Sequence, residues 1–205
     1  MSARNKTKWL AIIILAVLVV DQISKIWVKT HFVLGERVEI TSWFYLLFIE
    51  NQGMAFGMEM FGKLFLSIFR VVAVGLLAWF LVKLVRENYR FGFVLCIALI
   101  FAGAIGNLID SVFYGKIFSH SYGQLAELFP AAGGYAPLFY GKVVDMFYFP
   151  LFTFPEWLPL LGGDVFFSPV FNVADSAVTG GVFAILLFFR KELNRSLESK
   201  KKEGE

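Results

Sequence analysis

The sequence predicts an all-α membrane protein with four transmembrane helices, a small extracytoplasmic β-sheet and an aromatic segment at the membrane interface. The composition is the first observation behind this prediction. Of the 205 residues, 58% are hydrophobic and 18% aromatic but only 17% are charged, which is unlike a soluble domain. The second observation is a set of apolar stretches near the length of about 20 residues that a bilayer requires. The third is the clustering of Lys and Arg beside these stretches. We expect residues 1–205 to form a single membrane-embedded domain.

The first predicted span covers residues 9–28 and follows a basic segment, residues 4–8. A secretory signal peptide also begins in this way, but here no small-residue cleavage site follows the apolar run. We therefore expect a permanent helix. Asp21 and Lys25 are four residues apart on this helix, so their side chains share one face and can pair. Such a pair is either a structural ion pair or part of a functional site.

Residues 30–63 are mixed in character and predict a small curved sheet that rests on the membrane. The stretches 38–41 and 43–48 are rich in β-branched and aromatic residues, so each predicts a short strand. Glycines and amide side chains follow in residues 50–57, which predict a turn at the interface. Asn51 lies in this turn, either as a turn former or as a site residue.

The remaining spans are predicted at residues 64–85, 91–109 and 170–189. Three Lys and Arg residues precede the first span, three (Lys83, Arg86 and Arg90) lie from the end of the second span to the start of the third, and six follow the fourth. The positive-inside rule then puts both termini in the cytoplasm, with residues 30–63 and 111–168 on the other side of the membrane.

Two segments outside the spans carry predictions of their own. Residues 147–157 are strongly aromatic, and because aromatic rings favour the headgroup level we expect this part of the chain along the outer membrane surface. Residues 192–205 are highly charged and predict a solvated helix end that frays.

Small residues predict where helices approach one another closely. Gly103 and Gly106 lie in the third span, and Gly180 and Gly181 lie together in the fourth. Glycine at a helix interface lets two backbones come close, so these two spans are expected to pack tightly.

Polar residues cluster at one predicted depth, the outer end of the helices. Asn107 with Asp110 and Asn172 with Asp175 are each three residues apart, so on a helix the members of each pair point one way. Asp145 lies in an apolar stretch, where a solvated surface position is a weak explanation. Two carboxylates that meet about 3 Å apart share a proton, which lets one act as a base and the other as an acid.

Each of these residues also has a structural explanation. Asp110 could cap a helix end or pair locally with Lys116 or Lys142, and Asn107 and Asn172 could satisfy backbone groups at helix ends. From the residues alone, an acid pair competes with a proton or ion pathway through the membrane. A metal site is not expected, since Cys96 is the only cysteine and the two histidines have no ligand spacing.

Five blocks of the sequence, taken together and in order, resemble the signature blocks of the lipoprotein signal peptidase (signal peptidase II) family. They are Asp-Gln-Ile-Ser-Lys at 21–25, Asn-Gln-Gly-Met-Ala-Phe at 51–56, Gly-Ala-Ile-Gly-Asn-Leu-Ile-Asp at 103–110, Val-Val-Asp-Met-Phe at 143–147 and Phe-Asn-Val-Ala-Asp-Ser at 171–176. Any one block is a weak signal, but five in the family's order are specific.

The resemblance implies an aspartic endopeptidase of the bacterial inner membrane that acts at the periplasmic face. Such an enzyme removes the signal peptide from diacylglyceryl-modified prolipoproteins, cutting N-terminal to the lipidated cysteine. The family's catalytic pair corresponds to Asp145 and Asp175, with no metal or cofactor. The implied partners are lipid-modified signal peptides, membrane lipids and globomycin-type inhibitors, with no nucleic acid. Further residues match the polar positions of the family's substrate site: Asp21, Lys25, Asn51, Asn107, Asp110 and Asn172.

The sequence departs from the family pattern in two places. Ser111 stands where the family usually has Arg, so a contact made by that Arg would come from another residue, with Lys116 and Lys142 as candidates. More than thirty residues also join Asp110 to the Val-Val-Asp block, whereas a short connection of under about a dozen is usual. The extra length, residues 118–140, predicts a lid or docking surface.

A second class of function is a small transporter or channel subunit that conducts protons or ions. Its relay would consist of Asp21, Lys25, Asp145 and Asp175. Such a relay should continue to the cytoplasmic side, where Arg70 is the only other deep charge, so its second half is missing. A passive scaffold, a third class, leaves the clustered acids unexplained.

Overall fold

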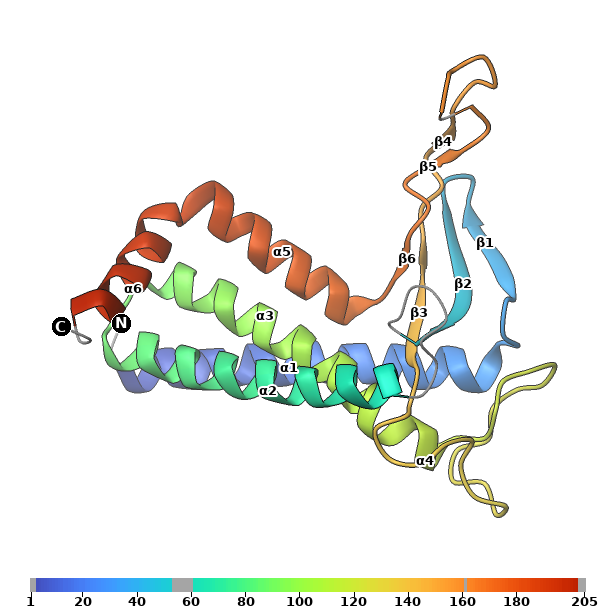
Figure 1. Cartoon of the computed structure of the whole chain (residues 1–205), viewed down its shortest axis with the longest axis horizontal. Helices are drawn as coiled ribbons and strands as arrows, with labels where there is room; N and C mark the ends of the chain where they lie inside the picture. Colours follow the sequence, from blue (N-terminus) through green and yellow to red (C-terminus); the bar gives the residue numbers. More distant parts are fainter. Residues whose placement is uncertain (1–2, 53–60, 161, 203–205) are drawn as a thin grey trace. The chain divides into compact units, whose positions relative to one another are not determined.

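The computed structural model describes residues 3–52, 61–160 and 162–202 (Figure 1). The chain forms two compact units. The first comprises Met1–Gln22, Leu64–Ile109 and Val173–Glu205, and the second comprises Ile23–Lys63 and Asp110–Asn172. The single membrane-embedded domain stays a prediction.

Long apolar helices dominate the first unit, as the sequence predicted. These are α1 (Ala3–His31), α2 (Phe61–Arg86), α3 (Phe91–Ile109) and α5 (Val173–Phe188); α1 continues into the second unit. The charged helix α6 (Arg190–Lys202) follows α5. Within the described residues, three helical stretches are long and apolar enough to cross a membrane: Arg4–His31, Gly62–Arg86 and Phe91–Ile117. Only 11% of the residues in the most apolar part of α2 are buried. Most of its side chains therefore face outward, as in a helix that contacts lipid.

The fourth span differs from its prediction. Residues 170–189 were expected to form one helix, but Val170–Phe171 is strand β6, and helix α5 begins only at Val173. The reason is pairing, because Phe171 and Val170 lie opposite Phe147 and Tyr148 of a neighbouring strand. α5 is therefore only about 24 Å long, and the chain bends by 91° between α5 and α6. If α5 and α6 are counted together as one bent span, the described residues hold four candidate spans instead of three.

Helix α5 packs against α3 through small residues. A Cβ atom on Gly103 would lie 2.3 Å from the carbonyl oxygen of Ala174, and one on Gly181 would lie 2.7 Å from that of Cys96. Neither distance is possible, so both positions require glycine. Close packing at Gly103 and Gly181 is confirmed, whereas a Cβ on Gly180 would meet nothing within 4 Å.

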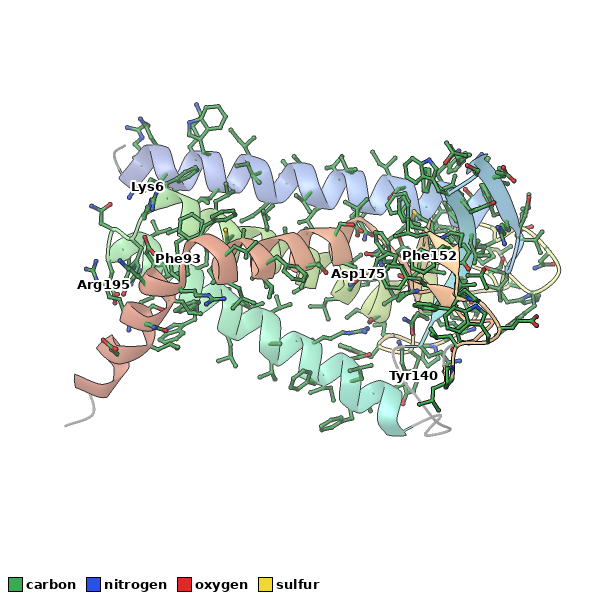
Figure 2. All side chains as sticks on the ribbon, turned by 90° about the horizontal axis from the view of Figure 1, so that it is seen from above. Lys6, Phe93, Tyr140, Phe152, Asp175 and Arg195 are labelled. Carbon is green, nitrogen blue, oxygen red and sulfur yellow. The ribbon has the colours of Figure 1, made fainter. Side chains whose placement is uncertain are left out.

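Three basic segments of the first unit lie together at one end of its helices. Lys6 Nζ donates to Asn88 Oδ1 at 2.6 Å and to the carbonyl oxygen of Tyr89 at 3.0 Å, and the Arg195 guanidinium lies 5.1 Å from the Tyr89 ring centroid. These contacts join the start of α1, the turn between α2 and α3, and α6. Asp175 lies at the opposite end of this unit (Figure 2).

The charged C-terminal segment forms helix α6 through Lys202, which agrees with the predicted helix end. Asn194, Arg195, Leu197 and Glu198 are exposed, whereas Leu193 packs against the buried core and Ser196 is only 3% exposed. The fraying of this end stays a prediction.

The second unit is built around an antiparallel sheet with strand order β1-β2-β3-β6. Its strands are β1 (Arg37–Thr41), β2 (Phe44–Asn51), β3 (Val143–Tyr148) and β6. The two strands predicted at 38–41 and 43–48 are confirmed, but the strands contributed by the later part of the chain were not predicted. The expected turn at residues 50–57 was wrong at Glu50 and Asn51, which extend β2, while residues 53–57 lie outside the described residues.

The chain between α3 and β3 begins with a change of helix type. Residues Asp110–Tyr114 form a π-helix, η1, followed by the short helix α4 (Gly115–Ile117). A Cβ on Gly141 would lie 2.0 Å from the carbonyl oxygen of Asp110, so glycine is required where the long connection returns past η1.

The aromatic segment after β3 exposes much of its apolar surface. It forms a second antiparallel sheet of β4 (Phe152–Thr153) and β5 (Val165–Phe166). Phe152 is 51%, Trp157 78% and Leu160 99% exposed. Large exposed apolar side chains in one segment mark a surface that contacts lipid or a partner.

Candidate active site

Asp145 lies in β3 and is only 3% exposed. The side-chain amide of Asn172 donates to its Oδ1 at 2.7 Å and to the carbonyl oxygen of Val144 at 3.2 Å. Asn172 is itself fully buried. One asparagine therefore holds both the carboxylate and the backbone beside it, which fixes the side chain of Asp145 on its strand.

Asp175 lies in the first turn of α5 and is half-buried. The Asn107 amide, from α3, donates to Asp175 Oδ1 at 2.7 Å. A carboxylate at this position is also favoured by the positive end of the helix dipole. The two acids thus share one feature, an asparagine amide that donates to the carboxylate at 2.7 Å.

One of the two pairs predicted to share a helix face does not do so, because Asn172 precedes α5 rather than lying on it. Asn107 lies in α3, and Asp110 begins the π-helix that follows it directly. Asn107 bonds to Asp175, while Asp110 pairs with a lysine of α1.

That lysine is Lys25, whose Nζ lies 2.8 Å from Asp110 Oδ2, and both side chains are fully buried. The cation beside Asp110 is therefore Lys25, whereas a local pair with Lys116 or Lys142 had been expected. Asp110 Oδ2 also accepts the N–H of Val144 at 3.3 Å. This ion pair therefore contacts β3 at the residue before Asp145.

Asp21 is fully buried and caps the helix that carries Asp175. Its Oδ1 accepts the N–H of Ala174 at 2.8 Å, and Gln22 Nε2 donates to its Oδ2 at 3.0 Å. An acceptor here satisfies one of the open N–H groups at the start of α5. Gly106 makes room, because a Cβ there would lie 2.6 Å from Asp21 Oδ2.

Asn51 ends β2 and lies opposite Val143 at the start of β3. Its side chain is exposed. Asn51 is thus two positions along the sheet from Asp145, which pairs with Ile49.

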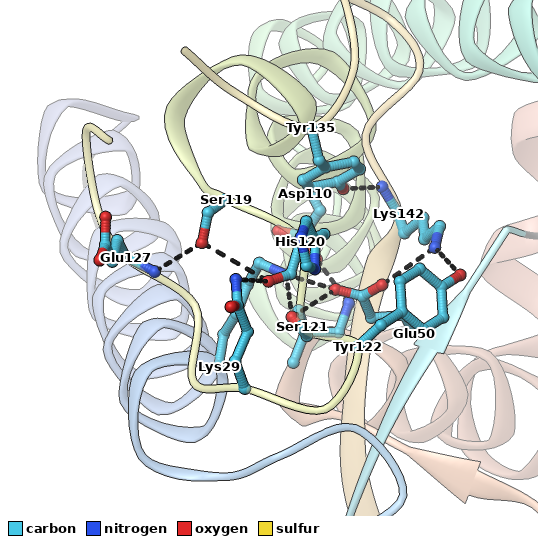
Figure 3. A network of polar contacts seen from close by, with 12 residues as sticks. Lys29, Glu50, Asp110, Ser119, His120, Ser121, Tyr122, Glu127, Tyr135 and Lys142 are labelled. Carbon is cyan, nitrogen blue, oxygen red and sulfur yellow. Dashed lines mark hydrogen bonds and ion pairs between the residues drawn. The ribbon is translucent and has the colours of Figure 1, made fainter. Parts of the chain in front are cut away.

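The sequence analysis missed a polar cluster in the second unit (Figure 3). Lys29 and Lys142 both bond to the carboxylate of Glu50, and Ser121 contacts Lys29 and Glu50 at 2.8 and 3.0 Å. One feature of the sequence does point to this cluster: Lys29 follows Lys25 by four residues, so both lie on the same face of α1. Glu50 and Lys142 are 92 residues apart, and no local pattern joins them.

Ser111 stands where the family usually has Arg. It is fully buried, and its carbonyl oxygen accepts the N–H of Gly141 at 2.9 Å. Of the two lysines considered as replacements for an arginine, Lys116 is exposed and Lys142 is bonded to Glu50 and Tyr122. Among the described residues, no three His, Cys, Asp or Glu side chains are grouped to hold a metal ion.

Comparison with known proteins agrees with these features. The profile of the family described as signal peptidase (SPase) II matches residues 13–190. A lipoprotein signal peptidase of Porphyromonas gingivalis is 52% identical over 199 residues, covering 95% of this chain and 88% of the relative. One from Amoebophilus asiaticus is 36% identical, covering 93% and 81%.

A solved structure of a bacterial membrane enzyme has the same fold. It aligns with 88% of this chain and 91% of its own, with a TM-score of 0.62 and 25% sequence identity. The family match does not favour the transporter interpretation. The chain is a membrane protein and a protease, and it belongs to the signal peptidase II family.

Proposed function

We propose that this protein removes the signal peptide from diacylglyceryl-modified prolipoproteins, cutting N-terminal to the lipidated cysteine, with Asp145 and Asp175 as the catalytic pair. The similarity to lipoprotein signal peptidases supports the substrate class. The observation that supports the residues is that each acid accepts an asparagine amide at 2.7 Å. Such bonds orient a carboxylate before the substrate arrives.

The covalent chain supports the pairing of the two acids. Asn172, which bonds to Asp145, is three residues before Asp175. Consecutive Cα atoms are about 3.8 Å apart, so the Cα atoms of Asn172 and Asp175 are within about 11 Å of each other. The side chain that holds one acid is therefore tied closely to the other.

The proposed chemistry is general acid and base catalysis by the two carboxylic groups. One of Asp145 and Asp175 takes a proton from a water molecule, whose oxygen then attacks the scissile carbonyl carbon. The other acid donates its proton to the carbonyl oxygen, which gives a neutral gem-diol. Return of a proton to the amide nitrogen lets the C–N bond break, releasing the amine of the lipidated cysteine and the carboxyl end of the signal peptide.

The other candidate residues are proposed to position the substrate and the acids. Asn51 would hold a substrate carbonyl, because a peptide in a low-dielectric groove needs fixed partners, whereas the amides of Asn107 and Asn172 orient the carboxylates of Asp175 and Asp145. Asp21 keeps the start of α5 in place, and the Lys25–Asp110 pair supports β3.

The distribution of charge supports a location in the bacterial inner membrane with both termini in the cytoplasm. The basic segments meet at one end of the first unit, and Asp175 lies at the other. By the positive-inside rule this supports a position of Asp175 at the periplasmic face. Residues 30–63 and 111–168 belong to one compact unit, which agrees with their assignment to that same side.

We further propose that the diacylglyceryl cysteine enters sideways from the lipid. The strands at residues 38–48 and the exposed aromatic segment 147–157 would cover its acyl chains. The exposed apolar side chains of Trp43 (53%) and Trp157 (78%) suit this role.

Cleavage of a diacylglyceryl-modified prolipoprotein by the purified protein in detergent tests the proposal. Asp145→Asn and Asp175→Asn should each lower kcat by about 10²- to 10⁴-fold. Asp164→Asn is the matched control, because Asp164 is an exposed acid of the second unit and its loss should leave cleavage unchanged. Full activity in either test variant would remove that residue from the pair.

Globomycin gives an independent check on the same site. A family inhibitor should block cleavage by the unsubstituted protein in a concentration-dependent way. Replacing Ser111 with Arg, the residue usual in the family, should strengthen inhibition if the missing arginine contacts the inhibitor. Complete resistance to globomycin would count against a family-type site.

A further inference from the structure

Glu50 is the centre of a buried cluster of charges within the second unit (Figure 3). Its carboxylate pairs with the ammonium group of Lys29, from α1, and at 3.1 Å with that of Lys142, which immediately precedes β3. The side chains of Lys29, Glu50 and Lys142 are 1%, 3% and 14% exposed. A buried ion pair adds little net stability, but separating its members is costly because each charge is then left uncompensated. The cluster therefore strongly favours the arrangement in which these three groups meet.

The cluster lies on the face of the sheet opposite to Asp145. In the pairing of β2 with β3, Ile49 lies opposite Asp145 and Glu50 lies opposite Val144. Side chains alternate between the two faces along a strand, and directly opposite residues share a face. Glu50 therefore points away from the face of Asp145, and Lys142 reaches it there. The charges thus lie directly behind the strand that carries the acid.

The apolar pattern of these two strands does not specify their register. Residues 44–49 of β2 are apolar or aromatic without a break, and residues 143–146 of β3 are all buried. A strand that alternates apolar and polar residues resists a slip by one residue, because the slip would turn its apolar face to water. Here a slip would leave apolar side chains on both faces, so another interaction has to select the register.

The pairing is also irregular close to Asp145. The register of β2 against β3 shifts between Leu46 and Ile49, and residues 49–51 pair with residues 143–145 beyond that shift. So short a run is held by few backbone hydrogen bonds. Its register therefore depends on the side chains at this end of the strands.

A slip by one residue would have two consequences. Asn51 now lies opposite Val143 and shares a face with Asp145, and after a slip these two site residues would be on opposite faces. Glu50 would turn away from Lys142 at the same time, which would leave both charges without their partner. The ion pair thus opposes the one change that would take the site apart.

The long connection between α4 and β3 contributes to the same cluster. Ser121 Oγ lies 2.8 Å from Lys29 Nζ and 3.0 Å from Glu50 Oε1. Tyr135 Oη accepts the backbone N–H of Lys142 at 2.7 Å, and the Tyr135 ring centroid lies 5.1 Å from Lys29 Nζ. The extra length of this chain therefore contacts all three charged residues.

We propose that the cluster of Lys29, Glu50 and Lys142 is a register lock, which fixes the pairing of β2 with β3 and so positions Asp145, and that residues 118–140 brace it. The inference deepens the proposed function, because it rests on the catalytic role proposed for Asp145. The three charged residues are positioning residues, since they act from the other face of the sheet.

Disulfide trapping in the full-length protein, purified in detergent, reads the register without using cleavage. Every variant carries Cys96→Ala, which removes the natural cysteine. Asn51→Cys/Val143→Cys joins directly opposite residues, whose spacing suits a disulfide, so this pair should cross-link on mild oxidation. Asn51→Cys/Val144→Cys places its thiols on opposite faces and should not cross-link.

Loss of the lock should change both results. With Glu50→Gln added, the 51/143 pair should cross-link more slowly and the 51/144 pair should begin to cross-link. Lys142→Met is a second variant for the same measurement. Glu87→Gln is the matched control, because Glu87 pairs with Lys83 at 3.5 Å in the first unit, and it should leave both results unchanged. An unchanged pattern in the two lock variants, with a Tm that shows them folded, overturns the inference.

Kinetics on a lipidated prolipoprotein give a second readout. Lys142→Met should lower kcat about 10²-fold, because a displacement of about 1 Å in a catalytic group can cost that much, with KM within about twofold. Lys142→Arg keeps the charge and should recover most of the activity. Ser121→Ala removes only the contact from the connection and should lower kcat by a smaller factor. Equal kcat values for the Met and Arg variants would show that the charge does not position the acid.

The two proposals fail in different ways. If Asp145→Asn retains cleavage, the proposed catalytic role of Asp145 fails, whereas the cross-links still report whether the cluster fixes the register. If Asp145→Asn is inactive but Glu50→Gln leaves the cross-links unchanged, only the register lock fails.

Discussion

The amide of Asn172 lies 2.7 Å from a carboxylate oxygen of Asp145, and both side chains are buried. An acid held in this way cannot rotate freely, and its orientation is set before a substrate binds. The same asparagine also bonds to the backbone of β3 at Val144, so the side chain and its strand are fixed together.

Replacement of Asn172 by Ala should therefore reduce the chemical step more than substrate binding. A displacement of about 1 Å in a catalytic group can cost about 10²-fold in rate, so we expect kcat to fall about 100-fold with KM within about twofold. Steady-state kinetics on a lipidated prolipoprotein measure both. Asn194→Ala, at an exposed position of α6, should match the unsubstituted protein, and equal kcat values for the two variants would contradict the positioning role.

The buried pair of Lys25 and Asp110 leads to a prediction about stability. Removal of one partner leaves an uncompensated buried charge, so Lys25→Met or Asp110→Asn should lower the free energy of unfolding by about 3–5 kcal/mol. The double variant Lys25→Met/Asp110→Asn should lose less than the sum of the single losses. Denaturant unfolding in detergent checks this, and strictly additive losses would show that the two groups do not interact.

Gly106 should not tolerate even a methyl group. In Gly106→Ala the added Cβ would push against Asp21 Oδ2 and disturb its bond to the N–H of Ala174. We expect a loss of about 1–3 kcal/mol of stability together with reduced cleavage. Gly180→Ala is the matched control, because a Cβ there meets nothing within 4 Å, and it should be neutral or slightly stabilising. Similar behaviour of the two variants would argue against the close contact.

Glu50 should make stability depend on pH in the acid range. Burial acts to raise the pKa of this carboxyl, but the ammonium groups of Lys29 and Lys142 outweigh burial and hold the pKa below its ordinary value of 4.5. A carboxyl with a lowered folded pKa stabilises the protein above its unfolded pKa, and that stability is lost as the pH falls through the folded value. Thermal melts should therefore show Tm falling below pH 4.5, and falling less steeply in Glu50→Gln. Parallel pH profiles for the two proteins would contradict this account.

The sequence predicted the helices better than the sheet, for a physical reason. Long apolar runs such as residues 91–109 are recognisable without their partners, and α3 has those same bounds. Strand β3 gives no alternating pattern, because Val143 to Met146 are all buried, as in a strand covered on both faces. Its partners β2 and β6 lie far away along the chain, so a local pattern could not identify it.

In the candidate site, too, local patterns could be predicted from the sequence and long-range contacts could not. The spacing of Asp21 and Lys25 correctly placed both on one buried face of α1, but the contacts of Lys25 with Asp110 and of Asp21 with Ala174 depend on how distant segments meet. The expected helix at Asn172 failed because strand pairing of Val170 and Phe171 delays the start of α5. Sequence identified the residue types, whereas tertiary packing determined their partners.

The bond between Asp21 and the backbone of Ala174 joins positions 153 residues apart. A ribosome makes the first of these residues long before the last, so a nascent chain carries Asp21 without the helix that it caps. The start of α5, and with it the anchorage of Asp175, can form only after nearly the whole polypeptide has been synthesised. On the proposed catalytic role of Asp175, proteolytic competence would be deferred to the end of biogenesis, and a truncated product would remain inert in the bilayer.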